Sequence, residues 1–145
     1  MAGRLPGWFG IEVLDIAPGL VHARLDLRAE FLAPNNFLHA GTLVTLADTC
    51  CGMGCLVSLP DGVAGFTTSE LKTNFLRTAG EDEALRCEAT LAHGGRTTQV
   101  WDALVKRESD ARNMALFRCT QFLLPAEDPR TERQARMRSP RSPAD

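Results

Sequence analysis

The feature that most constrains this chain is a long apolar segment that carries one formal charge. Between His39 and Pro60 the sequence reads AGTLVTLADTCCGMGCLVSL, and Asp48 is the single formally charged residue in it. The stretch from Gly41 to Leu59 is long enough for about five helical turns, and the Pro-Asp-Gly that follows is a strong stop signal. A helix that is apolar nearly all round needs cover on every side, so we expect it to lie at the centre of the fold.

Strand patterns lie on both sides of this helix in the sequence. Residues 8–27 are typical of a hairpin that turns at Pro18-Gly19, because the second arm alternates between apolar and polar residues. Four further strands are expected at residues 65–76, 84–93, 97–107 and 111–124. This order predicts an antiparallel meander with the helix against one face. We expect the sheet to curl around the helix and a second copy of the chain to cover the rest.

The composition is that of one ordinary domain with a charged extension. Of the 145 residues 44% are hydrophobic, and the formal net charge is −2. A chain of this length can form a core without disulfide bonds or structural metal ions. Because the net charge is small, neither nucleic acid nor a membrane is an expected partner. We assign residues 1–124 to the domain and predict that the charged, proline-rich residues 125–145 form a disordered tail.

Targeting signals and cysteines add little chemistry. No secretion signal is visible, which favours a cytoplasmic protein, and the glycines, hydroxyl residues and Asp48 in the apolar segment argue against a membrane span. Five cysteines are present without a CxxC pair. We expect Cys50 and Cys51 to be small packing residues rather than nucleophiles, and no metal or other cofactor is predicted.

The stretch HAGTLVTLADTCCG, together with the order of the strands, resembles the hotdog-fold acyl-CoA thioesterases, most of all their phenylacetate-pathway (PaaI-like) subfamily. His39, Gly41 and the run Leu46-Ala47-Asp48 match the histidine, the second glycine and the acidic signature of that subfamily. The later stretches TTSELKTNFLRTA, HGGRTTQVWDALV and ALFRCTQFLL resemble its strands, so the likeness spans roughly residues 10–124. It implies an α+β hotdog fold, a curved antiparallel sheet wrapped around one long central helix.

Three positions depart from the family pattern. Ala40 stands in place of the first glycine, Thr78-Ala79 where a Pro-Ala is usual, and Ala33 where the family often has asparagine. Asn35 or Asn36 could take the place of that asparagine. These differences affect the loop before the helix more than they affect the acid.

The resemblance implies an enzyme that hydrolyses an acyl-CoA thioester to CoA and a free acid. Asp48 would act as general base on a water, or as a nucleophile that forms an anhydride, and the sequence leaves both open. The backbone N–H groups of Ala40 and Gly41, at the positive end of the helix, would form an oxyanion hole. His39 would brace this loop or contact the thioester.

Thr68 resembles the family's hydroxyl residue that orients the attacking water. Thr67 or Ser69 would take this role if the register differs by one residue. A threonine chosen only for its fit to a strand is the alternative.

Distance restricts how these groups can meet. Nine residues separate His39 from Asp48, or about 13 Å along a helix that rises roughly 1.5 Å per residue. The acid therefore cannot easily reach a carbonyl held at its own helix start, whereas an antiparallel partner helix would bring the two together. The resemblance implies the same arrangement: a homodimer with two composite sites, each built from the helix start of one protomer and the acid of the other. We expect this dimer to assemble into a tetramer.

For contacts to coenzyme A the sequence offers Asn36 and a glycine-containing stretch: His93, Gly94, Gly95, Arg96 and Thr97. Glycine N–H groups and an arginine suit a phosphate, although a plain hairpin turn has the same composition.

Two other functions are the alternatives to a thioesterase. A hotdog module that binds acyl-CoA without hydrolysing it gains nothing from a desolvated acid, and a hotdog dehydratase usually keeps its Asp and His about five residues apart, unlike this chain.

Overall fold

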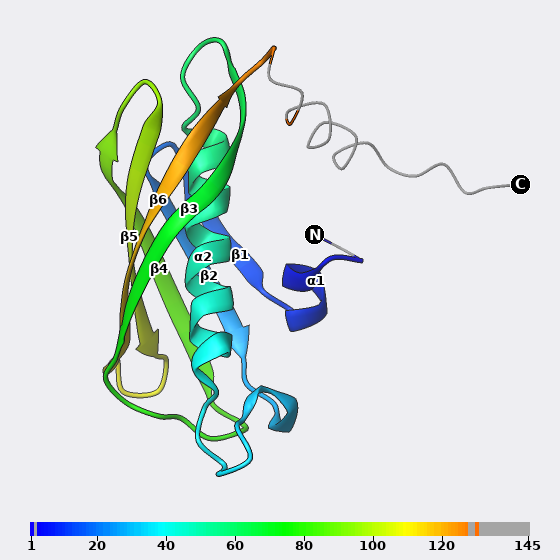
Figure 1. The fold of residues 1–145 in the computed structure, drawn as a ribbon. Helices are drawn as coiled ribbons and strands as arrows, with labels where there is room; N and C mark the ends of the chain where they lie inside the picture. Colours follow the sequence, from blue (N-terminus) through cyan, green and yellow to red (C-terminus); the bar gives the residue numbers. More distant parts are fainter. Residues whose placement is uncertain (2, 128–129, 131–145) are drawn as a thin grey trace, which may run out of the picture.

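The structure is a computed structural model that describes residue 1, residues 3–127 and residue 130. One long helix lies on one face of a twisted sheet, and a short helix packs near the N-terminus (Figure 1). The elements in chain order are α1 (Leu5–Phe9), β1 (Glu12–Ala17), β2 (Leu20–Asp26), a 3-10 turn (Ala29–Phe31), α2 (Ala40–Val57), β3 (Val63–Phe75), β4 (Ala84–Gly94), β5 (Thr98–Arg107) and β6 (Asn113–Pro125).

The sheet has six antiparallel strands in the order β1-β2-β4-β5-β6-β3. The expected antiparallel sheet with a helix on one face is confirmed, but the simple meander is wrong. Because α2 crosses the face of the sheet after β2, β3 joins the far edge beside β6, and β4 returns to pair with β2 (Figure 1). This leaves β3, a strand of 13 residues, paired on one side only within the protomer.

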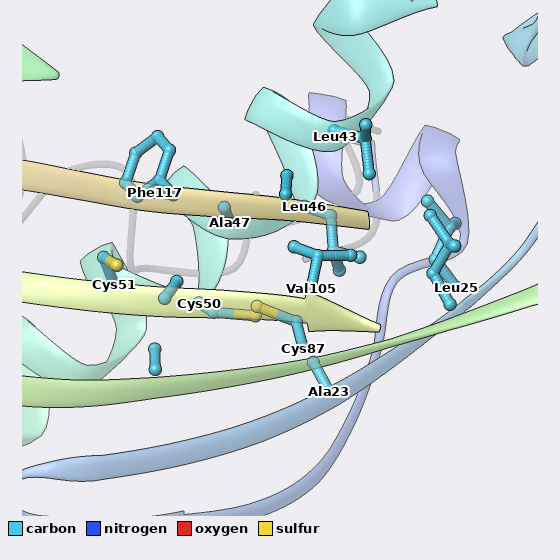
Figure 2. Packing of buried hydrophobic residues seen from close by; sticks show 14 of the residues in the cluster. Ala23, Leu25, Leu43, Leu46, Ala47, Cys50, Cys51, Cys87, Val105 and Phe117 are labelled. Carbon is cyan, nitrogen blue, oxygen red and sulfur yellow. The ribbon is translucent and has the colours of Figure 1, made fainter. Parts of the chain in front are cut away.

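The core lies between α2 and the sheet. Side chains from the buried side of α2, including Leu43, Leu46 and Cys50, meet inward side chains of the strands such as Val105 and Phe117 (Figure 2). All five cysteines are free and buried, as the sequence predicts for Cys50 and Cys51. Alternate residues of β2, β4, β5 and β6 supply this core because successive side chains point to opposite faces of a sheet.

Gly54 lets α2 approach the sheet closely. A Cβ at this residue would lie 2.5 Å from Cη2 of Trp101, which is fully buried. The indole N–H donates to Oε1 of Gln99, whose amide nitrogen donates in turn to the carbonyl of Ser58 at the end of the helix. These contacts fix the C-terminal end of α2 on the sheet.

By length and hydropathy alone α2 could cross a membrane, since residues Ala40–Val57 have a mean hydropathy of 1.4. Half of this stretch is buried inside the protein. The core helix of a globular fold has these same properties, so the hydropathy of α2 follows from its position against the sheet.

The N-terminal residues differ from the expected strand. Trp8, Phe9 and Gly10 were predicted to begin the hairpin, but Trp8 and Phe9 belong to the short helix α1, which has Pro6 in its first turn and ends at Gly10, at a φ of 76°. Proline favours the first turn of a helix and glycine the left-handed cap, which explains the change. The tail predicted at residues 125–145 lies mostly outside the described residues, and Pro125 is the last residue of β6.

Candidate active site

Asp48 lies in the middle of α2, half-buried, at the edge of a hollow of about 280 Å³. Its Oδ1 accepts a hydrogen bond of 3.2 Å from the hydroxyl of Thr68 on β3. Burial raises the pKa of the Asp48 carboxyl above its usual range, and the Thr68 bond lowers it in part. None of the ion pairs among the described residues involves Asp48, so the carboxylate is neither neutralised nor tied up by a cation.

The register of β3 selects Thr68 from the three hydroxyl residues proposed. Thr67 pairs with Phe122 and points to the outer face, and the Ser69 hydroxyl donates to the backbone carbonyl of Thr120. The register shifts between Thr68 and Glu70, which marks a β-bulge. Bulges are common next to active sites because they redirect a side chain.

Gln121 is a residue that the sequence analysis missed. It is fully buried opposite Thr68 on β6, and the Thr68 hydroxyl lies 3.0 Å from its Oε1. A hydroxyl has one proton to donate, so Asp48 and Gln121 compete for the same donor. A polar residue among the otherwise apolar inward positions of β6 was the sequence signal for it.

The start of α2 is capped by His39. Its Nδ1 accepts a hydrogen bond of 2.8 Å from the Gly41 N–H, and because Nδ1 is the acceptor, the neutral ring carries its proton on Nε2. A Cβ at residue 41 would lie 2.9 Å from that Nδ1, so glycine is required for this contact. The bracing role considered for His39 is therefore present in the structure.

This cap corrects the expected oxyanion hole. The Gly41 N–H already donates to His39 and is not open to a substrate. The Ala40 N–H has no hydrogen-bond acceptor among the described residues. The donors left at the helix start are thus the Ala40 N–H and the Nε2–H of His39.

The loop before α2 is fixed by contacts to two neighbours. The Leu38 N–H donates to the hydroxyl of Thr78, and the Thr42 hydroxyl donates to the carbonyl of Phe31. Thr78 stands where the family usually has a proline, and its hydroxyl supplies an acceptor for the loop. Asn36 sits in the same exposed loop with a φ of 63°, its N–H bonded to the carbonyl of Ala33.

The second group of predicted coenzyme A contacts lies elsewhere. His93 and Gly94 end β4, and residues 95–97 form the turn to β5, next to the C-terminal end of α2, where Gln99 bonds to Ser58. Asn36 and His39 lie at the other end of this helix of 18 residues, which is about 27 Å long at roughly 1.5 Å per residue. One protomer therefore does not bring Asn36 and residues 93–97 together.

The buried side of α2 does not lie directly opposite Asp48. Cys51 and Cys55, three and seven residues after the acid, are buried against the sheet, whereas Val57 is 42% exposed. At roughly 100° per residue, the buried side of α2 is centred about a third of a turn from Asp48 and not half a turn from it. The acid consequently lies at the border between the core and the hollow, which it shares with Met53.

The cysteines and metal chemistry offer no competing site. Burial raises the pKa of the Cys55 thiol to about 12, and a hydrogen bond with Cys119 and burial raise the pKa of the Cys51 thiol. Thiols of this kind are poor nucleophiles at neutral pH. Within the described residues no cluster of three or more His, Cys, Asp or Glu could hold a metal ion.

A larger hollow of about 480 Å³ lies on the outer face of the sheet, away from α2. Lys72, Asp102 and Arg118 are among its lining residues, and Asp102 is held by Arg118 at 2.6 Å. The Arg118 guanidinium lowers the pKa of the Asp102 carboxyl. An acid that is paired in this way is a surface ion pair rather than a base, so the hollow at Asp48 remains the candidate site.

Sequence comparison places the chain among known proteins. Residues 35–113 match the profile of the thioesterase superfamily. A curated protein of Deinococcus radiodurans, named only provisionally as an esterase, is 30% identical over 108 residues, which cover 74% of this chain and 70% of that protein.

Solved structures share the fold. The PaaI protein from the phenylacetic acid degradation operon of E. coli has a TM-score of 0.75 at 24% identity, covering 82% of this chain and 83% of that one. A hypothetical thioesterase from Streptococcus pneumoniae, solved with coenzyme A, has a TM-score of 0.73 at 24% identity, covering 79% and 86%. The hotdog fold expected from the sequence is confirmed.

The segment that matches the superfamily runs from the loop before α2, through Asp48, to the start of β6. It therefore contains the capped helix start, the half-buried acid and the Thr68 bond described above. The chain belongs to the thioesterase superfamily and is a thioester hydrolase.

Proposed function

We propose that this protein hydrolyses an acyl-CoA thioester to coenzyme A and a free acid, with Asp48 as the group that drives the attack. The observation that carries the proposal is the half-buried Asp48 carboxylate, which meets a hydroxyl and a hollow but, among the described residues, forms no ion pair with a cation. A carboxylate without a counter-ion in a partly desolvated site is basic enough to take a proton from water.

The proposed reaction needs two subunits. The donors at the helix start lie about 13 Å along α2 from Asp48, so the acid of one protomer would face the helix start of another. An exposed edge supports this homodimer: Leu71 and Phe75 of β3 lie on the same side of the sheet as α2 yet are 43% and 47% exposed. An unpaired edge strand with apolar side chains is a surface that another strand covers.

In the general-base route Asp48 takes a proton from water, and the hydroxide formed attacks the thioester carbonyl carbon. The oxygen of the tetrahedral intermediate is stabilised by the Ala40 N–H and the His39 Nε2–H of the partner protomer. The carbon–sulfur bond then breaks, and the coenzyme A thiolate takes up the proton that Asp48 removed from water. In the nucleophilic route Asp48 itself attacks the carbonyl carbon, and the carbon–sulfur bond breaks to release the coenzyme A thiolate. Water then cleaves the resulting anhydride, which frees the acid and Asp48, and a proton of that water goes to the thiolate.

Coenzyme A itself is proposed to lie between the two protomers. Asn36 sits at one end of α2 and residues 93–97 at the other, so antiparallel helices of a dimer would bring these two groups to the same site. The Streptococcus pneumoniae thioesterase was solved with coenzyme A, which supports this ligand. Arg96 and the glycine N–H groups of the turn are suited to its phosphates.

The test is a panel of acyl-CoA esters assayed by release of free thiol, with wild type beside Asp48→Asn. We expect loss of at least about a hundredfold in kcat, the usual contribution of a base. Asp61→Asn, an exposed loop acid, is the matched control and should keep full activity. Normal turnover by Asp48→Asn would refute the role of Asp48, and coenzyme A binding without turnover by wild type would identify the non-catalytic module instead.

A further inference from the structure

The hollow beside Asp48 is lined mainly by apolar or small residues. We infer that it receives the acyl group of the substrate, that this group is uncharged and of short to medium size, and that Gly52 and Phe66 set the size limit. The inference rests on the proposed function and goes further, since that proposal leaves the acyl group open.

The floor of the hollow runs along α2 away from the acid. Gly52 and Leu56 follow Asp48 at intervals of four residues, so they lie on one side of the helix, and Met53 flanks them. Leu56 is about 12 Å from Asp48 along the helix axis at roughly 1.5 Å per residue. A group whose carbonyl is attacked at Asp48 can therefore extend along this row toward the C-terminal end of α2.

The chemistry of the lining selects an uncharged group. Of the described residues that line the hollow, Asp48 alone has a charged side chain, and the others on α2 and β3 are apolar or small. A second carboxylate on the acyl group would lose water here, would meet no cationic side chain among the described lining residues and would be repelled by Asp48. Acyl groups with a terminal carboxylate should therefore be poor substrates.

The size of the hollow limits the length of the acyl group. A cavity of roughly 150 Å³ is large enough for benzene, so about 280 Å³ can hold one aromatic ring with a short linker or a medium aliphatic chain. Longer chains would have to leave the hollow and place apolar atoms in water.

Gly52 and Phe66 set the width. A Cβ at residue 52 would lie 3.0 Å from Cζ and 3.5 Å from Cε2 of the Phe66 ring. Because residue 52 is glycine, the ring can rest against the helix and leave the hollow open. A side chain at residue 52 would displace the ring into that space, and a smaller side chain at residue 66 would enlarge it.

The wall opposite α2 is held in place. Pro6 of α1 contributes to it, and α1 is anchored by Arg28, which donates to the carbonyl of Trp8 at 2.9 Å and stacks over the Trp8 and Phe31 rings at 4.8 and 4.3 Å. Stacking of an arginine on aromatic rings restricts its motion. The hollow is therefore bounded on both sides by fixed groups.

The experiment compares acyl specificity between variants. Values of kcat/KM for unbranched acyl-CoA esters from acetyl to dodecanoyl, and for benzoyl-, phenylacetyl- and succinyl-CoA, are measured by free-thiol release. Leu56→Ala and Phe66→Ala enlarge the hollow, and Gly52→Ala narrows it. Leu116→Ala is the matched control, since Leu116 is similarly exposed (47% against 37% for Leu56) but lies on the outer face of the sheet.

We expect both enlarging variants to move the preferred chain to greater length, and Gly52→Ala to move it to shorter length, each by about tenfold in the ratio of kcat/KM for the flanking substrates. Leu116→Ala should keep the wild-type order. Wild type should prefer butyryl- to succinyl-CoA, which have equal numbers of acyl carbons, by about tenfold or more.

The outcomes separate this inference from the proposed function. Leu56 is on the helix surface, so Leu56→Ala should fold even if a change at Gly52 or Phe66 does not. An unchanged order of substrates in a folded Leu56→Ala, or equal use of succinyl- and butyryl-CoA, would overturn the inference while the role of Asp48 stands. Failure of wild type to hydrolyse any ester would overturn the proposed function itself.

Discussion

Replacing Thr68 by valine should move the acid limb of the pH profile to higher pH. Valine has the shape of threonine without the hydroxyl and favours a strand as well as threonine does, so β3 should keep its register. The change removes the one side-chain hydrogen bond that stabilises the charged form of Asp48. Burial then acts on the carboxyl unopposed, and its pKa rises further.

The size of the shift follows from the bond. A hydrogen bond to a charged group contributes about 1.5–3 kcal/mol, and one pKa unit corresponds to about 1.36 kcal/mol. The bond is 3.2 Å long and shares its donor with Gln121, which places it at the lower end of the range. We expect the Asp48 pKa to rise by about one unit.

The assay is the pH dependence of kcat/KM for a good acyl-CoA substrate, for wild type, Thr68→Val and Thr68→Ser. In the proposed mechanism Asp48 acts in its ionised form, so the acid limb of Thr68→Val should lie about one pH unit above that of wild type, and Thr68→Ser should restore it. Ser69→Ala, which removes a hydroxyl bonded only to the Thr120 carbonyl, should leave the limb in place. A limb that stays or moves to lower pH in Thr68→Val would refute the reasoning.

Other contacts lead to separate expectations. Gln121→Met removes the acceptor that competes for the neighbouring hydroxyl, so the acid limb should move to lower pH, the opposite direction. Asp48→Asn should raise the thermal stability at neutral pH. The Asp48 pKa is higher in the folded protein than its unfolded value of 3.8, so the stability of wild type falls as the pH rises from that value through the folded-state pKa. Below the unfolded value Asp48 is protonated in both states, and the gain of Asp48→Asn over wild type should vanish. Gly54→Ala places a Cβ 2.5 Å from the Trp101 ring and should cost about 1–3 kcal/mol, seen as a lower Tm. Leu71→Arg on the free edge of β3 should give a monomer in sedimentation experiments that has lost thioester hydrolysis, and an active monomer would contradict the composite site.

Much of the fold is readable from local patterns. The apolar segment expected at Gly41–Leu59 is α2 at Ala40–Val57, and the strand expected at residues 84–93 is β4 at Ala84–Gly94. Long periodic runs bounded by turn residues leave few alternatives. The pairing of β3 with β6 is not contained in such patterns, because each strand is equally suited to several neighbours and only the path of α2 across the sheet decides.

The candidate site was predictable where it depends on short motifs. The Asp48–Thr68 pair was expected from the resemblance, and the register of β3 places the two side chains together. The hydrogen bond from the Gly41 N–H to His39, which removes this N–H from the expected oxyanion hole, was not predicted. The sequence does not reveal whether a backbone N–H already donates to a neighbouring ring. Gln121 is 73 residues from Asp48 along the chain, and its contact with Thr68 exists only once β3 and β6 are paired.

The position of the acid within α2 has a physical consequence for the assembly. If His39 of one helix lies beside Asp48 of an antiparallel partner, symmetry places the partner's Asp48 beside the first His39, so a single pairing creates two sites. An acid placed at the helix start would be stabilised by the helix dipole and held at low pKa, close to the donors but a weak base. Mid-helix placement separates the acid from the dipole within each chain, and in the proposed dimer the partner's helix start would lie close to the acid again. In this proposal the basicity of Asp48 and the need for a second protomer have one origin, the location of the carboxylate nine residues after the helix cap.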